Sequence, residues 1–195
     1  LGIVLGRPDY ESPEQVLRDA DTAMYRAKSA GKSGYVVFDE GMHQQALGRL
    51  QLETDLRLAF ERGEFRVHYQ PIIELASGRL VGAEALVRWL HPRRGLLVPA
   101  DFLPLAEESG LITQLDAWVL GEACACLGRW RQRSPWLSMN VNVDERQMLA
   151  PGLVDEVLSL LGRHQLPAES LRLEVTETAF RSGRGEAERH LLSLK

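Results

Sequence analysis

Three short segments of the chain alternate apolar residues with polar or charged ones at a period of two. They cover residues 80–89, 137–143 and 171–177. Side chains of a β-strand point alternately to the two faces of a sheet, so each segment, as a strand, has one apolar and one polar face. The polar faces carry, in chain order, Glu84 and Arg88, Asn140 and Asn142, and Glu174 and Thr176. The alternation therefore predicts a sheet with oxygen-bearing side chains on one face and a packed core on the other.

The connections between these strands distinguish two kinds of sheet. Alternation alone is typical of an antiparallel sheet with one solvent-facing side. Residues 101–109 and 113–133 separate the first two strands, however, and residues 144–164 separate the second from the third. Apolar residues recur there at the three- and four-residue spacing of helices, as Leu115, Val119, Ala123 and Leu127, and as Val154, Val157, Leu158 and Leu161. Strand–helix–strand order predicts an α/β fold of parallel strands covered by helices.

In such a fold the polar faces line the interior of a barrel or a cleft. Carboxylates and amides buried there need partners, and a divalent cation, which prefers oxygen ligands, can satisfy several of them at once. The pattern therefore indicates a metal site inside a sheet-based enzyme.

Composition excludes several other classes of protein. The 195 residues carry a net charge of −4, which argues against a nucleic-acid polymer or an anionic membrane surface as partner. No apolar run is long enough to span a bilayer, and the N-terminal residues do not form a signal peptide. Cys124 and Cys126 are two residues apart in an expected helix and face different directions, which disfavours a disulfide or a zinc pair.

Three regions follow one another along the chain. Residues 1–39 are expected to form a strand, a helix beginning near Pro13 and a closing strand. The residues of this helix that are expected to face a core are Val16, Leu17, Ala20, Ala23, Met24 and Ala27. An amphipathic helix is expected over residues 40–62, either as a linker between domains or as a surface element of the next domain. Residues 65–73 are expected to form a strand. The turn at 76–79 predicts that this strand pairs with the strand bearing Glu84 as an antiparallel hairpin.

Several spaced motifs resemble two known families. The run from Asp19 to Lys28, followed by Ala30-Gly31-Lys32, is similar to the C-terminal helix of a GGDEF (diguanylate cyclase) domain. From about residue 50 onward the chain resembles an EAL domain. The motifs that carry this resemblance are Tyr69-Gln70-Pro71-Ile72, Glu84-Ala85-Leu86-Val87-Arg88-Trp89, Pro104-Leu105-Ala106-Glu107, Asn142-Val143-Asp144-Glu145-Arg146-Gln147 and Glu174-Val175-Thr176-Glu177.

The resemblance implies a fold and a domain order. EAL domains are modified (β/α)8 TIM-like barrels, and residues 63–195 are expected to be the N-terminal half of one. Residues 1–39 would be the C-terminal remnant of a GGDEF α+β domain, and residues 40–62 the linker or entry helix. Because the chain begins in a strand without Met and stops on a helix, we expect it to be a fragment of a longer GGDEF-EAL protein.

The resemblance also implies an activity. EAL domains hydrolyse the bacterial messenger cyclic di-GMP to linear pGpG with Mg²⁺ or Mn²⁺. Divalent cations can bridge a phosphate and generate hydroxide from a bound water near neutral pH. A homodimer in the cytoplasm, or at the cytoplasmic face of the inner membrane, is expected for the longer protein.

Family roles transfer to matching residues. Glu84, Asn142 and Glu174 would be metal ligands, and Glu84, Glu174 and Glu177 would be the catalytic residues. Asn142 is preferred to Asn140 because it lies nearer the C-terminal end of its strand, where barrel sites form. Glu177 would be the second acid of the ExTE motif, which supports an active-site loop. Arg88 would bind a substrate phosphate, and Gln70 would line the nucleotide pocket.

Two departures from the family pattern matter. Asp144 stands where the family usually has a small residue, often Ser, and both can cap a helix N-terminus. The family's Asp-Asp pair, catalytic Lys and later Glu and Gln have no counterpart in these residues, so the 195-residue chain by itself is expected to be inactive. The alternative to an active phosphodiesterase is a receptor that binds cyclic di-GMP without cleaving it.

Overall fold

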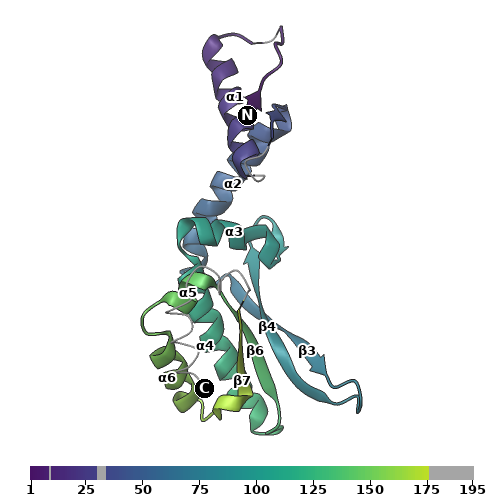
Figure 1. Cartoon of the computed structure of the whole chain (residues 1–195), viewed down its shortest axis with the longest axis vertical. Coiled ribbons are helices and arrows are strands. Elements are labelled where there is room, and N and C mark those ends of the chain that lie inside the picture. Colours follow the sequence, from purple (N-terminus) through teal and green to yellow (C-terminus); the bar gives the residue numbers. More distant parts are fainter. Residues whose placement is uncertain (9, 30–33, 176–195) are drawn as a thin grey trace. The chain divides into compact units, whose positions relative to one another are not determined.

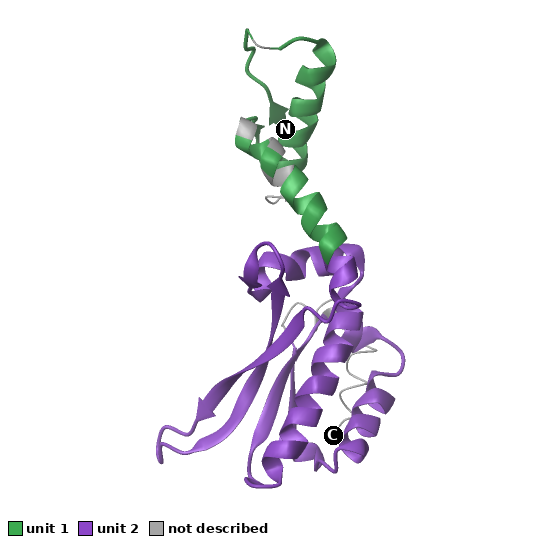
Figure 2. Ribbon diagram, turned by 180° about the vertical axis from the view of Figure 1, so that it is seen from behind, with its two compact units in different colours: residues 1–55 green, residues 56–195 purple. Residues whose placement is uncertain are grey.

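The computed structural model describes residues 1–8, 10–29 and 34–175 of the chain. In chain order, the elements are β1 (Gly2–Ile3), α1 (Pro13–Ser29), β2 (Val36–Val37), α2 (Glu40–Ala59), β3 (Phe65–Ile73), β4 (Leu80–His91), β5 (Gly95–Leu97), α3 (Pro99–Ser109), α4 (Ile112–Arg131), β6 (Ser138–Val143), α5 (Glu145–Leu149), α6 (Leu153–Arg163), the 3₁₀ turn η1 (Ala168–Ser170) and β7 (Leu171–Val175) (Figure 1). They fall into two compact units, residues 1–55 and 56–195, and the division lies within α2 (Figure 2).

The first unit contains the predicted strand–helix–strand arrangement. β1 and β2 pair in parallel, and α1 connects them. Ala23 and Ala27 of α1 are buried, as predicted. The prediction was wrong for Leu17 and Met24, which are 66% and 36% exposed, because the two-residue strands cover only a narrow stripe of the helix.

The second unit is built on one mixed sheet in the order β3-β4-β6-β7, with β5 added to the end of β4. β3 and β4 are antiparallel, whereas β4, β6 and β7 run parallel, so both predicted relationships are confirmed. β3 lies at one edge of this path, the kind of strand in which a proline such as Pro71 is tolerated.

The apolar face of the sheet forms the core of this unit. Its buried residues are Ala83, Ala85 and Val87 of β4 and Met139, Val141 and Val143 of β6. α4 packs alongside β6, and α6 lies beyond α4 (Figure 1). The four α4 residues predicted to face the core are all buried, namely Leu115, Val119, Ala123 and Leu127. Burial of these branched and straight apolar side chains is the main stabilising contribution of the layer.

Two features differ from the sequence-based expectation. The connection over residues 144–164 is two helices, because Pro151 cannot continue α5 and Gly152, with φ of 101°, starts α6 afresh. The restarted helix turns a different stripe inward, so Leu158 is 54% exposed while Leu153 and Leu160 are buried. Strand β5, which pairs with β4 through Leu97 opposite Trp89, was not predicted.

Among the residues that the structure describes, no helix combines the length and apolar character that crossing a bilayer would require.

The parallel pairing of β4 with β6 generates a test of the fold. A Cβ atom at Gly82 would lie 2.6 Å from the backbone oxygen of Ser138 on the neighbouring strand, so Gly82→Ala forces the strands apart. We expect a loss of about 1–3 kcal/mol in the free energy of unfolding. Gly162 of α6 has open space around the same position, so Gly162→Ala is the matched control and should gain about 0.5–1 kcal/mol. Equal effects in chemical denaturation would contradict this register.

Candidate metal and substrate site

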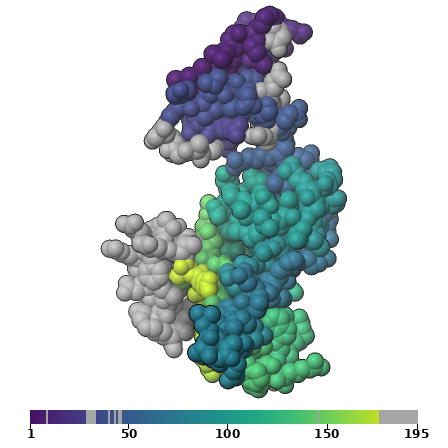
Figure 3. All heavy atoms as spheres, turned by 90° about the vertical axis from the view of Figure 1, so that its right-hand side faces the viewer, coloured from purple at the N-terminus to yellow at the C-terminus, as the bar shows by residue number. Residues whose placement is uncertain are grey.

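The polar face of the sheet brings together predicted site residues from four strands. In the register of the sheet, Glu84 of β4 lies between Gln70 of β3 and Asn140 of β6, and Asn142 lies beside Glu174 of β7. These pairings put all five side chains on the face opposite the buried apolar residues. Seen from the side away from α4 and α6, the β3–β4 hairpin (blue) and β7 (yellow) reach the molecular surface (Figure 3).

Two hydrogen bonds connect the carboxylates of this face to the amides of β6. The Asn142 side-chain amide donates to Glu84 Oε1 at 2.8 Å, and the Asn140 amide donates to Glu174 Oε1 at 2.6 Å. Each bond runs diagonally across the sheet, because the donor asparagine lies two residues away from the asparagine that is the register partner of the carboxylate. The structure therefore brings Glu84, Asn142 and Glu174 to one side of the sheet, and it brings Asn140 there as well.

The oxygen donors of this face suit a hard divalent cation. Carboxylate and carboxamide oxygens are the groups that Mg²⁺ and Mn²⁺ bind. Asn140 Oδ1 is buried and has no hydrogen-bond partner among the described residues, so one oxygen acceptor at this place is unsatisfied. Within the same residues, no three side chains of His, Cys, Asp or Glu cluster closely enough to hold a metal. A cation held here would therefore use carboxamide oxygen in addition to Glu84 and Glu174, or further carboxylates.

Arg88 lies on the same face, four residues beyond Glu84 toward the C-terminal end of β4. Its guanidinium donates to the carbonyl of Val87 at 2.8 Å, and the side chain is half-buried. Its register partner on β3 is Arg66, which donates to the carbonyls of Gly63 and Phe65 at 2.7 and 2.6 Å. Two guanidinium groups on directly opposed residues repel each other, and an anion between them would relieve that repulsion.

The remaining predicted site residue, Glu177, lies outside the described residues, as does Thr176. Gln70 is exposed at the β3 edge, opposite Glu84. Arg66 was missed by sequence reasoning, although counting back along the predicted hairpin from Arg88 would have found it. No local pattern marks Asn140 as the partner of Glu174.

The exit of β6 is fixed by capping interactions just beyond Asn142. Asp144 caps α5, as predicted, since its carboxylate accepts from the backbone N–H of Arg146 at 2.8 Å. The backbone N–H of Asp144 in turn donates to Asp116 Oδ2 of α4 at 3.1 Å. Asp116 thus links the helix that covers the sheet to the strand end that carries Asn142, a role that no sequence pattern indicated.

Burial sets the protonation of Asp116. Desolvation raises the pKa of this carboxyl from 3.8 to about 7. The hydrogen bond from Asp144 opposes that effect, while the nearby charges of Asp144 and Glu107 add to it. The two cysteines of α4 are also buried, and burial raises the pKa of Cys124 to about 11, so its thiol stays protonated at neutral pH.

Comparison with known proteins identifies the fold that carries this site. Residues 53–195 match the EAL domain family. The chain belongs to the EAL family. The EAL match begins at residue 53, so the resemblance of residues 1–39 to the end of a GGDEF domain stays a prediction.

Two curated relatives from Pseudomonas aeruginosa have described activities. The bifunctional diguanylate cyclase/cyclic di-GMP phosphodiesterase MucR is 44% identical over 184 residues, which are 93% of this chain and 27% of the relative. The cyclic di-GMP phosphodiesterase NbdA is 39% identical over 181 residues, which are 92% of this chain and 23% of the relative. This EAL chain therefore spans about a quarter of the length of each of these relatives.

Solved structures agree with the sequence comparison. The PaMucR phosphodiesterase in complex with c-di-GMP superposes with a TM-score of 0.70 at 42% sequence identity, and the superposition covers 74% of this chain and 59% of that one. The sheet and its helices are therefore those of an EAL domain.

The raised pKa of Asp116 predicts a pH dependence of stability. Its carboxyl binds a proton more tightly in the folded chain than in the unfolded chain between pH 3.8 and about 7. The free energy of unfolding should therefore fall as the pH rises through this window, by at most about 1.4 kcal/mol per pH unit. Asp116→Asn keeps an oxygen that can accept from Asp144 but removes the titration.

Urea unfolding at pH 5 and pH 8 measures this effect. Asp116→Asn should be more stable relative to the wild type at pH 8 than at pH 5. Asp155→Asn, at an exposed position of α6, removes one carboxylate elsewhere and serves as the control. A variant whose stability difference from the wild type is the same at both pH values would contradict the assignment.

Proposed function

We propose that this chain contributes metal-binding and substrate-binding residues to the metal-dependent hydrolysis of cyclic di-GMP to linear pGpG. The observation that carries the proposal is the pair of diagonal hydrogen bonds that hold Glu84 to Asn142 and Glu174 to Asn140 on one face of a parallel sheet. The membership in the EAL family and the phosphodiesterase relatives MucR and NbdA support it.

In this proposal, Glu84, Asn142 and Glu174 hold Mg²⁺ or Mn²⁺. The bound cation would neutralise phosphoryl oxygens and lower the pKa of a water molecule. The amides of β6 keep both carboxylates turned toward the same face, which is the arrangement that a shared ligand requires. Asp116 and Asp144 would act indirectly, because they fix the strand end on which Asn142 stands.

The substrate would be held at the neighbouring positions. Arg88 offers two parallel N–H donors to a phosphate of the cyclic dinucleotide, and Arg66 opposite it adds a second positive charge. Gln70, exposed beside Glu84, would contact the nucleotide. Glu177 would support the loop that follows β7.

The domain organisation forms part of the proposal. Residues 1–39 would be the end of a GGDEF domain, residues 40–62 the linker helix and residues 63–195 the first half of the EAL barrel. The Asp-Asp pair, Lys, Glu and Gln that complete the family's site would come from a longer polypeptide that works as a cytoplasmic homodimer. The 195 residues alone should then show no phosphodiesterase turnover.

Substitution of the metal-binding residues tests the proposal in the polypeptide that includes the complete barrel. Glu84→Gln, Asn142→Ala and Glu174→Gln should each lower the rate of pGpG formation with Mg²⁺ or Mn²⁺ by about 100-fold or more. Asn142→Ala removes an oxygen ligand, and each Glu→Gln change replaces a charged carboxylate by a neutral carboxamide, which binds a divalent cation more weakly. Arg88→Gln should weaken substrate binding and raise KM. The control is Glu169→Gln, an exposed carboxylate on η1 just before β7, which should leave turnover unchanged.

Two outcomes separate an enzyme from a receptor. Metal-dependent pGpG production by the wild type supports hydrolysis. Tight cyclic di-GMP binding that depends on Arg88 and Gln70, with no turnover in either cation, would instead assign the chain to a receptor.

A further inference from the structure

Arg172 of β7 is a positive charge on the same face of the sheet as the carboxylates of the proposed metal site. It precedes Glu174 by two residues, so both side chains leave the strand on one face, about 6.6 Å apart along it. In the register of the sheet, Arg172 lies beside Asn140, and Asn140 lies beside Glu84. This long cationic side chain therefore starts close to both carboxylates.

The guanidinium of Arg172 nevertheless turns to another residue. Its Nη1 donates to Ser138 Oγ at 3.2 Å, at the N-terminal end of β6. Arg172 forms no ion pair with any carboxylate among the described residues. It also leaves Oδ1 of its register partner Asn140 without a hydrogen bond from any described donor. Opposite charges at neighbouring positions of one sheet face attract each other, so this orientation needs a physical reason.

Ser138 is arranged to accept the hydrogen bond from Arg172. Its hydroxyl has one hydrogen, which it donates to the carbonyl of Val81 on β4 at 3.3 Å, so its lone pairs are left for the guanidinium. Ser138 is 6% exposed, and a Cβ atom at its register partner Gly82 would lie 2.6 Å from Ser138 Oγ. The hydroxyl is thus fixed in a narrow space between two strands, and it keeps that place because residue 82 is glycine.

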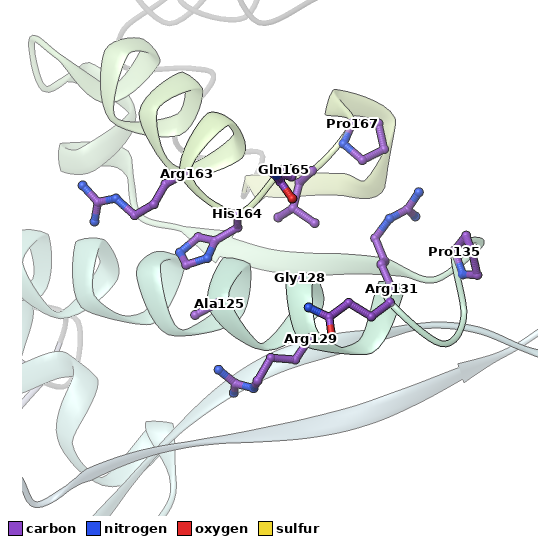
Figure 4. Close-up of a pocket in the computed structure, with 11 residues that line it drawn as sticks. Ala125, Gly128, Arg129, Arg131, Pro135, Arg163, His164, Gln165 and Pro167 are labelled. Atoms are coloured by element: carbon purple, nitrogen blue, oxygen red, sulfur yellow. The ribbon is translucent and has the colours of Figure 1, made fainter.

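The arginines around a pocket of about 510 Å³ at the ends of α4 and α6 are held differently. Arg131 donates to the carbonyl of Leu137 at 2.6 Å. In Figure 4, Arg129 and Arg163 extend away from each other, so their charges do not converge. All three arginines lie in the last turns of helices, where a positive charge compensates the helix dipole. Arg172 has no helix end to compensate, so its charge on the sheet requires another explanation.

A positive charge beside two carboxylates has two opposite effects. It relieves the repulsion between Glu84 and Glu174, and it weakens their attraction for a divalent cation. In direct contact with a carboxylate, a guanidinium would also occupy the oxygens that bind the cation. Both effects depend on distance, so the residue that holds the guanidinium of Arg172 determines the balance between them.

We propose that Arg172 sets the affinity of the Glu84–Asn142–Glu174 site for its divalent cation, and that Ser138 is a positioning residue that keeps the guanidinium away from Glu174. The inference rests on the proposed function of that site. Bound to Ser138, Arg172 reduces the repulsion between the carboxylates and leaves their oxygens free. Released from Ser138, it would turn to Glu174 or to Asn140 Oδ1 and compete with the cation.

Calorimetric titration of Mn²⁺ into the polypeptide that includes the complete barrel tests this inference. Arg172→Gln keeps an N–H donor for Ser138 and removes the charge, so it should bind Mn²⁺ about tenfold more tightly than the wild type. Ser138→Ala removes the acceptor and lets the guanidinium turn to the carboxylates, so it should bind Mn²⁺ about tenfold more weakly. General damage to the fold would weaken binding in both variants.

A double variant and a control assign these effects to the pair. Ser138→Ala combined with Arg172→Gln should bind Mn²⁺ as tightly as Arg172→Gln alone, because no charge remains to be released. Arg133→Gln removes the same charge at an exposed position just beyond α4. This matched control should bind Mn²⁺ as the wild type does.

Stability without a cation gives a readout that does not depend on loading the site. In EDTA, Arg172→Gln should melt at a lower temperature than the wild type, because Glu84 and Glu174 lose a nearby positive charge. Mn²⁺ should then raise its melting temperature by more than it raises that of the wild type. Arg133→Gln should match the wild type in both conditions.

Three results would overturn the inference. In the first, Arg172→Gln binds Mn²⁺ no more tightly than the wild type. In the second, Ser138→Ala weakens Mn²⁺ binding equally in the Arg172→Gln background, which would make Ser138 a purely structural residue. In the third, Arg172→Gln raises KM for cyclic di-GMP and leaves Mn²⁺ binding unchanged, which would place the guanidinium on the substrate.

The same titration separates this inference from the proposed function. If Glu84→Gln and Glu174→Gln weaken Mn²⁺ binding while Arg172→Gln does not strengthen it, the metal site stands and the role of Arg172 is wrong. If Glu84→Gln and Glu174→Gln bind Mn²⁺ as the wild type does, the proposed function itself is wrong.

Discussion

The parallel pairing of β4, β6 and β7 is the constraint on which the rest of this structure depends. It places the polar side chains of the three strands on one face of the sheet. Asn140 and Glu174, 34 residues apart in sequence, and Asn142 and Glu84, 58 residues apart, therefore hydrogen-bond across that face. The same pairing places the alternate, apolar side chains of these strands on the other face, which α4 covers. A shift of one residue in any strand would exchange the two faces and bury the carboxylates in the apolar core. Packing of the core therefore also fixes the geometry of the polar face.

Asparagine is suited to the central strand of such a face. Its amide donates to a carboxylate without adding positive charge, so Glu84 and Glu174 stay oriented and retain their negative charge for a cation. A lysine or arginine in the same positions would neutralise the carboxylates and compete with a metal. This arrangement leaves Asn140 Oδ1 without a partner in the described residues, and such a buried unsatisfied acceptor costs about 1–3 kcal/mol. An acceptor left without a hydrogen bond by the protein is expected at a place where a bound ligand supplies the missing partner.

Local sequence patterns predicted most of the strands and helices, but they did not predict the interactions that connect one element to another. Alternation predicted the three strands and their polar faces, helical spacing predicted α4 and its buried stripe, and the turn at 76–79 predicted the antiparallel hairpin. Asp144 was predicted as a cap because capping is decided within three residues. Asp116, Arg66 and β5 were missed because each depends on a partner on another element. The break between α5 and α6 was missed because apolar spacing continues past Pro151 although the backbone cannot.

The two ends of the strands show how one fold can separate stability from binding. At the N-terminal ends, Gln165 holds a strained backbone and Arg129 and Arg163 lie without carboxylate partners in the described chain. At the C-terminal ends, Gln147 of α5 is 2% exposed and neither its amide nitrogen nor its oxygen has a partner among the described residues. Between the ends, Met139, Val141 and Leu127 are fully buried and well packed. Stability therefore comes from the packed middle of the layer, and the strained backbone of Gln165 and the unpaired carboxamide of Gln147 lie outside it.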